Sequence, residues 1–346
     1  MKVGFRSMGR VALTGVVGMV AMLATAAPGT AQTPDWAKVA ADAKAEGGLV
    51  LYTGLIGAPS TKAIAKAFEA KYGIPVQVLE ARASELRERI RTEQAAGRYL
   101  GDVMFSSDSQ AVILNAEDKS LAPHGEVPNA RALTGGFRDD GLKAPVMTIN
   151  YGLLLNNKLV PVGDEPRSWK DLTDPKWKGK ILSDDMRAVG GGYVMFYATD
   201  EKLGKAFHDK LADQNLQFTR EYREAGKRVA RGEMAIYQPF ILSDMVNLKG
   251  LPVRSVVPAE GAPYVLYASA MLKGAPHPNA AKLYIDFTMS EEVQKIFATD
   301  GYGIVRSEVL DKISPEARAM SDVKLMGTSD PKRQNEMLDL ARSIYK

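Results

Sequence analysis

The sequence predicts an α/β protein made of two units, each with a parallel sheet covered by helices. From residue 48 onward, short apolar runs bounded by turn residues alternate with segments whose apolar residues recur at helical spacing. A strand, helix, strand, helix, strand order produces parallel strands, because each helix carries the chain back across the sheet. A second such series begins after a long extended passage at 144–157, so two units are expected.

The first unit is expected to begin with a strand at 48–54, GLVLYTG, followed by a helix that Pro59 opens. The run IPVQVLEA (74–81) is typical of the next strand. The charged amphipathic segment after it predicts a helix with Ser84 as its N-cap. The stretch GDVMFSSDSQAVILNA (101–116) then predicts a third strand, a loop rich in serine and aspartate, and the start of another helix.

The second unit continues the alternation. Ser168, with Asp171 three places later, predicts the start of a short helix. Further strands are predicted at 178–185, at 232–240 and twice within 251–274. The segment 277–299 has helical spacing, with a break expected near the Met289-Ser290 pair. At least two extended passages are thus available to run between the units.

The first 31 residues have the layout of a secretory signal peptide. A basic start is followed by the apolar run VALTGVVGMVAMLATA, which is too short and too rich in small residues for a comfortable membrane span. Small residues then suit a signal peptidase, and cleavage is expected after Ala31, with Ala27 as the alternative. An uncleaved N-terminal anchor is the other interpretation. A cleaved signal predicts a protein of the periplasm.

Composition excludes several classes of protein. The chain has no cysteine, which rules out disulfides, thiolate metal sites and a lipid-anchored cysteine. It has 45 Lys+Arg and 41 Asp+Glu, and the signal carries three of the bases, which leaves 42 bases against 41 acids. A chain so close to balance has no general attraction to nucleic acid or to anionic membranes.

The common hydrolase patterns are missing. The chain has three histidines, and it contains neither an HExxH nor a GxSxG sequence. Adjacent carboxylates at Asp184-Asp185 leave a secreted carboxylate-pair enzyme as an alternative, although neighbouring residues in extended backbone point in opposite directions. No catalytic residue and no cofactor is therefore assigned.

Polar loops follow several predicted strands, at the edge where open α/β sheets bind ligands. In the stretch SDDMRAVGGGYVMF, the glycines around Gly191 let backbone amides approach a ligand, and a helix starting there favours a negative group. Arg187 suits a bidentate contact to a carboxylate or phosphate, and Asp184 suits a hydroxyl, an amine or Arg187 itself. The same residues also fit an ordinary glycine-rich turn with an Arg–Asp surface pair.

The sequence resembles the periplasmic solute-binding proteins of ABC importers, in the branch that includes ferric-iron, phosphonate and sugar-phosphate binders. The resemblance rests on the order and spacing of LVLYTG, GDVMFSSDS, VMTINYGLLLNNKLV, PRSWKDLTDPKWKGKI and the long segment from YASAMLKG to GYGIV. It implies a two-lobed, type 2 periplasmic-binding architecture with a ligand cleft between the lobes. One lobe would hold residues 32–148 and 260–303, and the other 149–259 and 304–346.

The resemblance also implies a mechanism and partners. A ligand that touches both lobes favours the closed state, which a permease in the inner membrane then recognises. The protein is expected to be a monomer that binds no nucleic acid. The expected ligand-binding residues are Tyr52, Thr53, Ser107, Asp108, Tyr151, Asp184, Arg187, Gly191 and Tyr237.

Ferric iron is the alternative cargo. Ferric binders of the family commonly use two adjacent tyrosines, but here the corresponding place reads Tyr237-Gln238. Ferric iron is a hard ion that needs several anionic oxygens, and only Tyr237 stands in the expected region. The sequence therefore favours a small anionic organic solute, such as a carboxylate, a phosphonate or a phosphate ester.

Overall fold

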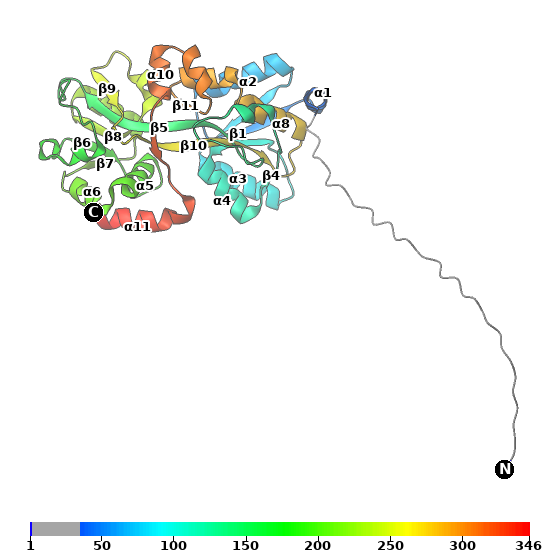
Figure 1. Ribbon diagram of the computed structural model, residues 1–346, viewed down its shortest axis with the longest axis horizontal. Coiled ribbons are helices and arrows are strands. Elements are labelled where there is room, and N and C mark those ends of the chain that lie inside the picture. Colours follow the sequence, from blue (N-terminus) through cyan, green and yellow to red (C-terminus); the bar gives the residue numbers. More distant parts are fainter. Residues whose placement is uncertain (2–34) are drawn as a thin grey trace. The chain divides into compact units, whose positions relative to one another are not determined.

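The computed structural model describes Met1 and residues 35–346 (Figure 1). The expected signal peptide and its cleavage site therefore fall, except for Met1, outside the described residues. From residue 35 onward the described chain packs as one compact unit. Within this part, no helix combines the length and the apolar character needed to cross a membrane.

One mixed sheet runs through the described chain in the order β2-β1-β3-β10-β5-β8-β6-β7. Its two long central strands are β5 (Ala144–Asn156) and β10 (Ala262–Leu272). The first half of β5 pairs with β10, and its second half pairs with β8 and β9. These strands pass from one half of the molecule to the other, as Figure 1 shows for β5. We call the half that contains β1 the first lobe and the half that contains β6 the second lobe.

The first lobe is built on three parallel strands, as the sequence predicted. Its strands are β1 (Leu49–Thr53), β2 (Val76–Glu80), β3 (Val103–Ser107), β4 (Leu121–Ala122) and β11 (Gly303–Ile304). Strand β1 pairs in parallel with both β2 and β3. Its helices are α1 (Trp36–Glu46), α2 (Pro59–Tyr72), α3 (Ala83–Ala95), α4 (Asp108–Asp118), α8 (Pro278–Thr288) and α9 (Glu291–Thr299).

Helices cover both faces of the first-lobe sheet. On one face, Phe68 of α2, Ile285 of α8 and Phe297 of α9 pack in a single apolar core. On the other, Leu86 of α3 and Leu114 of α4 pack against the opposite side of the strands. Fully burying side chains of this size contributes roughly 1.5–3 kcal/mol each. The short helix η1 (Pro128–Ala132) extends the first of these faces.

The second lobe repeats the design. Its strands are β6 (Ile181–Asp184), β7 (Gln217–Thr219), β8 (Ile236–Ile241) and β9 (Val253–Val256), and β6 pairs in parallel with β7 and β8. Its helices are α5 (Gly191–Leu203), α6 (Lys205–Ala212), α7 (Tyr222–Arg231) and α11 (Gln334–Ile344). Helices α5, α6 and α11 share one core, and α7 shares another with the 3-10 helix η4 (Leu242–Leu248).

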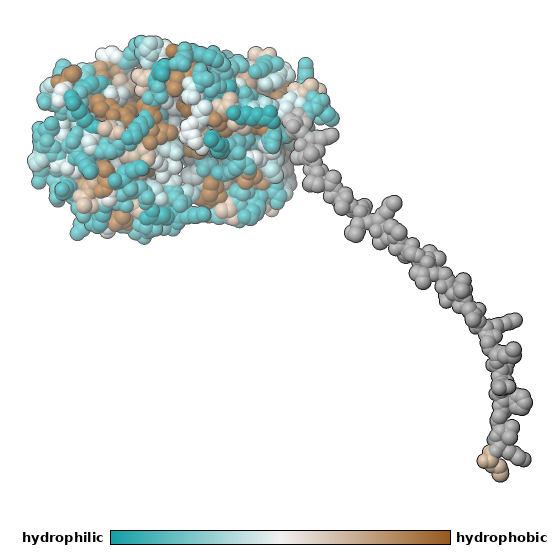
Figure 2. Space-filling model, in the orientation of Figure 1, coloured by the Kyte–Doolittle hydropathy of each residue, from teal (hydrophilic) through white to brown (hydrophobic). Residues whose placement is uncertain are grey.

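Short elements complete the chain: η2 (Trp169–Thr173), η3 (Pro175–Trp177), η5 (Ser307–Lys312), α10 (Pro315–Ser321), β12 (Leu325–Gly327) and η6 (Pro331–Arg333). Hydrophilic residues cover most of the face shown in Figure 2, with separate hydrophobic patches between them. The residue boundaries expected for the two lobes stay a prediction.

Two local expectations have different outcomes. The break near Met289 is confirmed, because α8 ends at Thr288 and the Ser290 hydroxyl accepts the N–H of Val293 at the start of α9. The N-cap expected at Ser84 is wrong. Helix α3 starts two residues earlier than expected, with Arg82 as its N-cap and the Glu85 carboxylate accepting the Arg82 N–H at 3.1 Å.

Candidate functional site

The glycine-opened helix predicted from the sequence exists, and a carboxylate of the chain itself occupies its start. Helix α5 begins at Gly191, directly beyond the carboxyl end of β6. Asp184, the last residue of β6, accepts the N–H of Gly192 at 2.8 Å through Oδ2 and the N–H of Asp185 at 3.0 Å through Oδ1. The helix dipole and these two donors stabilise the negative charge of Asp184.

Arg187 lies in the Arg–Asp pair that the sequence left open as an alternative. Its Nε lies 2.8 Å from Oδ1 of Asp185, and its Nη2 lies 3.2 Å from Oδ2 of the same carboxylate. The guanidinium also stands over the ring of Phe218, 4.5 Å from the ring centroid. The structure therefore gives Arg187 two partners within its own lobe.

Tyr151 packs directly against the start of α5. A Cβ added to Gly191 would lie 2.9 Å from Cε1 of Tyr151 and 3.2 Å from Oδ2 of Asp184. Only glycine leaves room for this close approach of ring, backbone and carboxylate. The Tyr151 side chain is 6% exposed, and its hydroxyl forms no hydrogen bond with another described residue. Tyr151, Asp184 and Gly191 thus form one contiguous group.

Two more side chains of the second lobe lie within electrostatic range of this group. Burial raises the pKa of the Tyr237 phenol well above its usual value, and the charges of Asp184 and Asp244 raise that pKa further. Burial, the Tyr267 phenol and the same two carboxylates raise the pKa of Tyr151 in the same way. Asp244 lies in η4, which follows β8. Both acids are therefore close enough to affect the pKa of the two tyrosines, although Tyr151 packs in the core with α5 and Tyr237 packs in the other core, with α7.

Burial also raises the pKa of both carboxylates. For Asp184, the two backbone donors and the nearby charge of Arg220 offset part of this effect. For Asp244, Arg223 offsets part of it. No ion pair among the described residues involves either acid, because Arg223 stands over the ring of Tyr222 and Arg220 donates to the carbonyl of Val189.

The first lobe contributes a second group that reaches the same boundary. A Cβ on Gly54 would lie 3.1 Å from Oγ of Ser106 and 3.5 Å from the hydroxyl of Tyr267. The Ser106 hydroxyl is buried and has no hydrogen-bond partner. Burial raises the pKa of Tyr267 to about 12. Tyr267 also raises the pKa of Tyr151, and β10, which carries Tyr267, pairs with β5, which carries Tyr151, so the two groups lie in neighbouring strands.

Three predicted residues surround this first-lobe group. Ser107 occupies the N-cap position of α4 without capping it, and it accepts instead a long hydrogen bond from the Ser109 hydroxyl at 3.4 Å. Asp108 forms an ion pair with Lys143 at 2.8 Å. Thr53 is fully buried, and its hydroxyl accepts the N–H of Leu55. Among the described residues, no side chain caps the amide groups at the start of α4.

Tyr52 lies on the other face of the sheet. Successive residues of a strand point to opposite faces, and Tyr52 packs in the core beneath α3 and α4. Its hydroxyl donates to the Glu93 carboxylate, with oxygen distances of 2.9 and 3.2 Å. Arg89 also binds Glu93, at 2.7 Å. The structure thus separates Tyr52 from the group around Tyr151.

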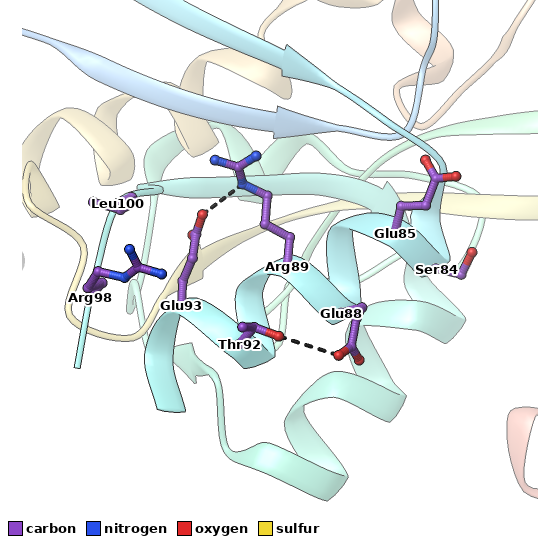
Figure 3. A pocket seen from close by; sticks show the side chains of 8 residues that line it. All are labelled: Ser84, Glu85, Glu88, Arg89, Thr92, Glu93, Arg98 and Leu100. Carbon is purple, nitrogen blue, oxygen red and sulfur yellow. Dashed lines mark hydrogen bonds and ion pairs between the residues drawn. The ribbon is translucent and has the colours of Figure 1, made fainter. Parts of the chain in front are cut away.

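A cavity of about 680 Å³ lies beside Glu93, the partner of Tyr52 and Arg89 (Figure 3). It is lined by Ser84, Glu85, Glu88, Arg89, Thr92, Glu93, Arg98 and Leu100. All eight residues come from α3 and the loop after it, so a ligand held there would contact the first lobe alone. Such a ligand has no means of favouring a closed arrangement of two lobes. The lobe junction is the better candidate site.

The junction brings together some predicted residues and adds others. Tyr151, Asp184 and Gly191 gather there, whereas Tyr237 packs in the core with α7, and Tyr52 and Arg187 bind other partners. Sequence reasoning missed Tyr222, Asp244, Tyr267 and Tyr302. A glycine before Tyr302 and a polar residue just after β8 were the available signals. Burial, Asp300 and then Tyr267 and Asp244 raise the pKa of Tyr302, and Gly301, just before it, packs against Ser243, next to Asp244.

The donor set for a metal is limited to oxygen. No trio of histidine, aspartate or glutamate side chains gathers in a metal-binding arrangement within residues 35–346. The junction instead offers phenol and carboxylate oxygens, which are hard ligands.

Comparison with known proteins identifies the family. Residues 63–324 match the family described as bacterial extracellular solute-binding protein. The chain belongs to this family. It is a solute-binding protein of the type found in ABC importers, as the sequence predicted, and such proteins are binding proteins rather than enzymes.

One curated relative and two solved structures are similar to this chain. A putative 2-aminoethylphosphonate-binding periplasmic protein of Salmonella typhimurium is 25% identical over 255 residues, which cover 70% of this chain and 73% of the relative. Iron-bound HitA of Pseudomonas aeruginosa has a TM-score of 0.68 at 24% identity, with 86% and 99% of the two chains covered. AfuA of Actinobacillus pleuropneumoniae, with fructose-6-phosphate bound, has a TM-score of 0.63 at 24% identity, with 86% and 96% covered. These likenesses establish the two-lobed periplasmic-binding fold.

Proposed function

We propose that this solute-binding protein works in the periplasm, where it captures a small anionic organic solute between its lobes and delivers it to an ABC permease. The observation that carries the proposal is the meeting of two side-chain groups at the lobe junction. Tyr267 and Ser106 come from the first lobe, and Tyr151 and Asp184 come from β5 and the second. A solute that touches both groups favours the closed state, which is the physical basis of receptor closure.

The anionic part of the solute fits the first lobe best. The start of α4 offers backbone amides that no described side chain caps, and the positive end of the helix dipole lies there. Ser106 adds a buried hydroxyl without a partner, which provides a second reason to expect a ligand at this place. Relatives are named for binding a phosphonate and are seen with a sugar phosphate, and both ligands are small organic anions.

A thermal-shift screen tests the proposal. A ligand that binds only the folded protein raises the melting temperature. Purified protein should be stabilised by at least one member of a panel of carboxylates, phosphonates and sugar phosphates. The Ser106→Ala variant should bind that compound more weakly. Conversion of the bound compound on long incubation would favour the carboxylate-pair enzyme instead. A panel with no stabilising organic compound would contradict the proposal.

Ferric iron is a second candidate, and one observation favours it. Two carboxylates are close enough to affect the pKa of Tyr151 and of Tyr237, and phenol and carboxylate oxygens are donors of the kind that Fe(III) prefers. HitA, which has a similar fold, is iron-bound. Iron bound by tyrosinate is coloured, so a ferric-citrate-treated sample should absorb visible light if iron is the cargo. A colourless sample would dismiss iron.

A further inference from the structure

The second lobe contributes two acids, Asp184 and Asp244, that form no ion pair with a described residue, although the charges of Arg220 and Arg223 offset part of the effect of burial on their pKa values. Asp184 and Asp244 are both largely withdrawn from water, and neither pairs with a described lysine, arginine or histidine. The arginine predicted to serve this region, Arg187, is already bound to Asp185. A buried carboxylate without a counter-charge is costly, and proteins normally retain one where a cation joins it.

The side chains beside these acids point to the kind of cation. Tyr151 and Tyr237 are 6% and 2% exposed, and neither hydroxyl has a partner among the described residues. The Tyr151 ring and Oδ2 of Asp184 both lie within 3.3 Å of the position of a Cβ on Gly191. Aromatic faces next to carboxylates attract an organic cation, through the ring quadrupole as well as through charge.

We propose that the solute is a zwitterion, an inference that rests on the proposed function. Asp184 receives its ammonium group beside the ring of Tyr151, and Asp244 is the second acid of the same region. The anionic group of the same molecule would bind at the start of α4 in the first lobe. A zwitterion therefore has one charged end for each lobe. Its length connects the two lobes, so closure and recognition depend on the same contacts.

An ammonium group suits these acceptors better than a metal ion does. Each oxygen of Asp184 already accepts a backbone N–H, from Asp185 and from Gly192. The lone pairs that remain can still accept a hydrogen bond, and an ammonium group has three hydrogens to share among carboxylate and phenol oxygens. Ferric iron needs tyrosinate ligands, and burial raises the pKa of both phenols, which opposes their ionisation.

Pairs of compounds that differ only in the ammonium group test the proposal. The probes are 2-aminoethylphosphonate against propylphosphonate, and β-alanine against butyrate, each measured by calorimetry on the purified protein. In each pair a methyl group replaces the ammonium at nearly the same size. Hydrogen bonds to charged groups are worth enough to make the amine of at least one pair bind about tenfold or more tightly.

Variants of the two acids test which residues produce the preference for the amine. Asp244→Asn should reduce the affinity for the amine about tenfold while leaving the affinity for its methyl counterpart unchanged, and Asp184→Asn should do the same. The matched control is Asp185→Asn, because Asp185 is adjacent in sequence but pairs with Arg187, and the preference for the amine should survive. Asp244 caps no helix, so its variant remains informative even if Asp184→Asn fails to fold.

The two proposals fail in different ways. If the methyl compounds bind as tightly as the amines, the zwitterion inference is overturned while the organic-anion receptor stands. An amine preference that survives in both Asp184→Asn and Asp244→Asn would also overturn the inference. If none of the four probes nor any other organic compound binds and ferric citrate does, the proposed function fails and the inference falls with it.

Discussion

Asp184 and Gly192 form a hydrogen bond of 2.8 Å that closes the start of α5 with a carboxylate from the preceding strand. The glycine-rich stretch therefore stabilises a negative side chain, whereas the sequence suggested a place for a negative ligand. Gly192 itself has no room for a side chain, since a Cβ there would lie 2.6 Å from the backbone oxygen of Asp184. The helix start thus presents Asp184 to the lobe junction as a fixed acceptor.

Gly191→Ala should weaken solute binding more than it weakens the fold. The new methyl would press on the Tyr151 ring at 2.9 Å and on Oδ2 of Asp184 at 3.2 Å, so both groups must move. Overpacking of this kind costs about 1–3 kcal/mol. We expect the affinity for the solute found in the thermal-shift screen to fall about tenfold or more, measured by calorimetry.

Gly190→Ala is the matched control for that variant. Its backbone is extended, and its nearest neighbour would be Oδ2 of Asp184 at 3.6 Å, which is an ordinary contact. Its affinity should stay within about twofold of the wild type, a difference of less than 0.5 kcal/mol. Equal losses in the two variants would show that the Tyr151 contact does not matter for binding.

Arg187→Ala should leave solute affinity nearly unchanged. Asp185 and the Phe218 ring already hold the guanidinium, so the residue is not free to reach a ligand. The pair is partly exposed, and its loss together with the ring contact should cost about 1 kcal/mol of unfolding free energy. Urea unfolding of Arg187→Ala, Asp185→Ala and the double variant gives the coupling. A loss of binding in Arg187→Ala would restore the arginine to the site.

Tyr52→Phe should destabilise the first lobe without affecting binding. The phenol hydroxyl is buried and donates to Glu93, and a hydrogen bond to a charged group contributes about 1.5–3 kcal/mol. Because Arg89 still binds Glu93, we expect the lower end of that range in urea unfolding. Tyr99→Phe is the control, since Tyr99 is exposed and its hydroxyl forms no hydrogen bond with another described residue. A change in solute affinity in Tyr52→Phe would place Tyr52 in the site after all.

The elements could be predicted because their signals are local. Apolar runs bounded by turn residues identified β1, β2 and β3, and the order of elements correctly implied parallel pairing. The break at Met289 was visible because Ser290 is a good N-cap. The N-cap of α3 was missed because a glutamate carboxylate accepts the Arg82 N–H, so the cap residue needed no side-chain acceptor of its own.

The composition of the site depended on long-range contacts that no local pattern reports. The sequence predicts both Tyr52 and Thr53 in the site, whereas the two side chains point to opposite faces of β1, and the helices that cover each face come from distant segments. Tyr302 reaches the junction because Gly301 packs so closely on Ser243 that a Cβ would lie 2.9 Å from its Cα. Asp244 follows Ser243 in the chain. Its place near the junction could not be predicted, because it depends on the same long-range contact between Gly301 and Ser243.

His208 should make the second lobe sensitive to acid. Its Nδ1 lies 2.7 Å from the Tyr345 hydroxyl and its Nε2 lies 3.1 Å from Oγ1 of Thr199. The Thr199 hydroxyl donates to the carbonyl of Met195, so a neutral imidazole with its proton on Nε2 satisfies every partner. Burial lowers the pKa of His208 from 6.5 to about 3.

The direction of this pH effect follows from the linkage between proton binding and folding. Between pH 6.5 and about 3, His208 binds a proton in the unfolded chain but not in the folded chain. The stability that is present above pH 6.5 is therefore lost as the pH falls. Over the whole window the effect is on the order of 5 kcal/mol, by the usual conversion of a pKa difference. Carboxylates with raised pKa, such as Asp286, act in the opposite direction.

The quantity to measure is therefore the difference in unfolding free energy between the wild type and His208→Gln, from urea unfolding at pH 7, 5.5 and 4. The variant should be less stable at pH 7 and lose less stability on acidification, and parallel losses in both proteins would show that His208 is protonated in the folded state.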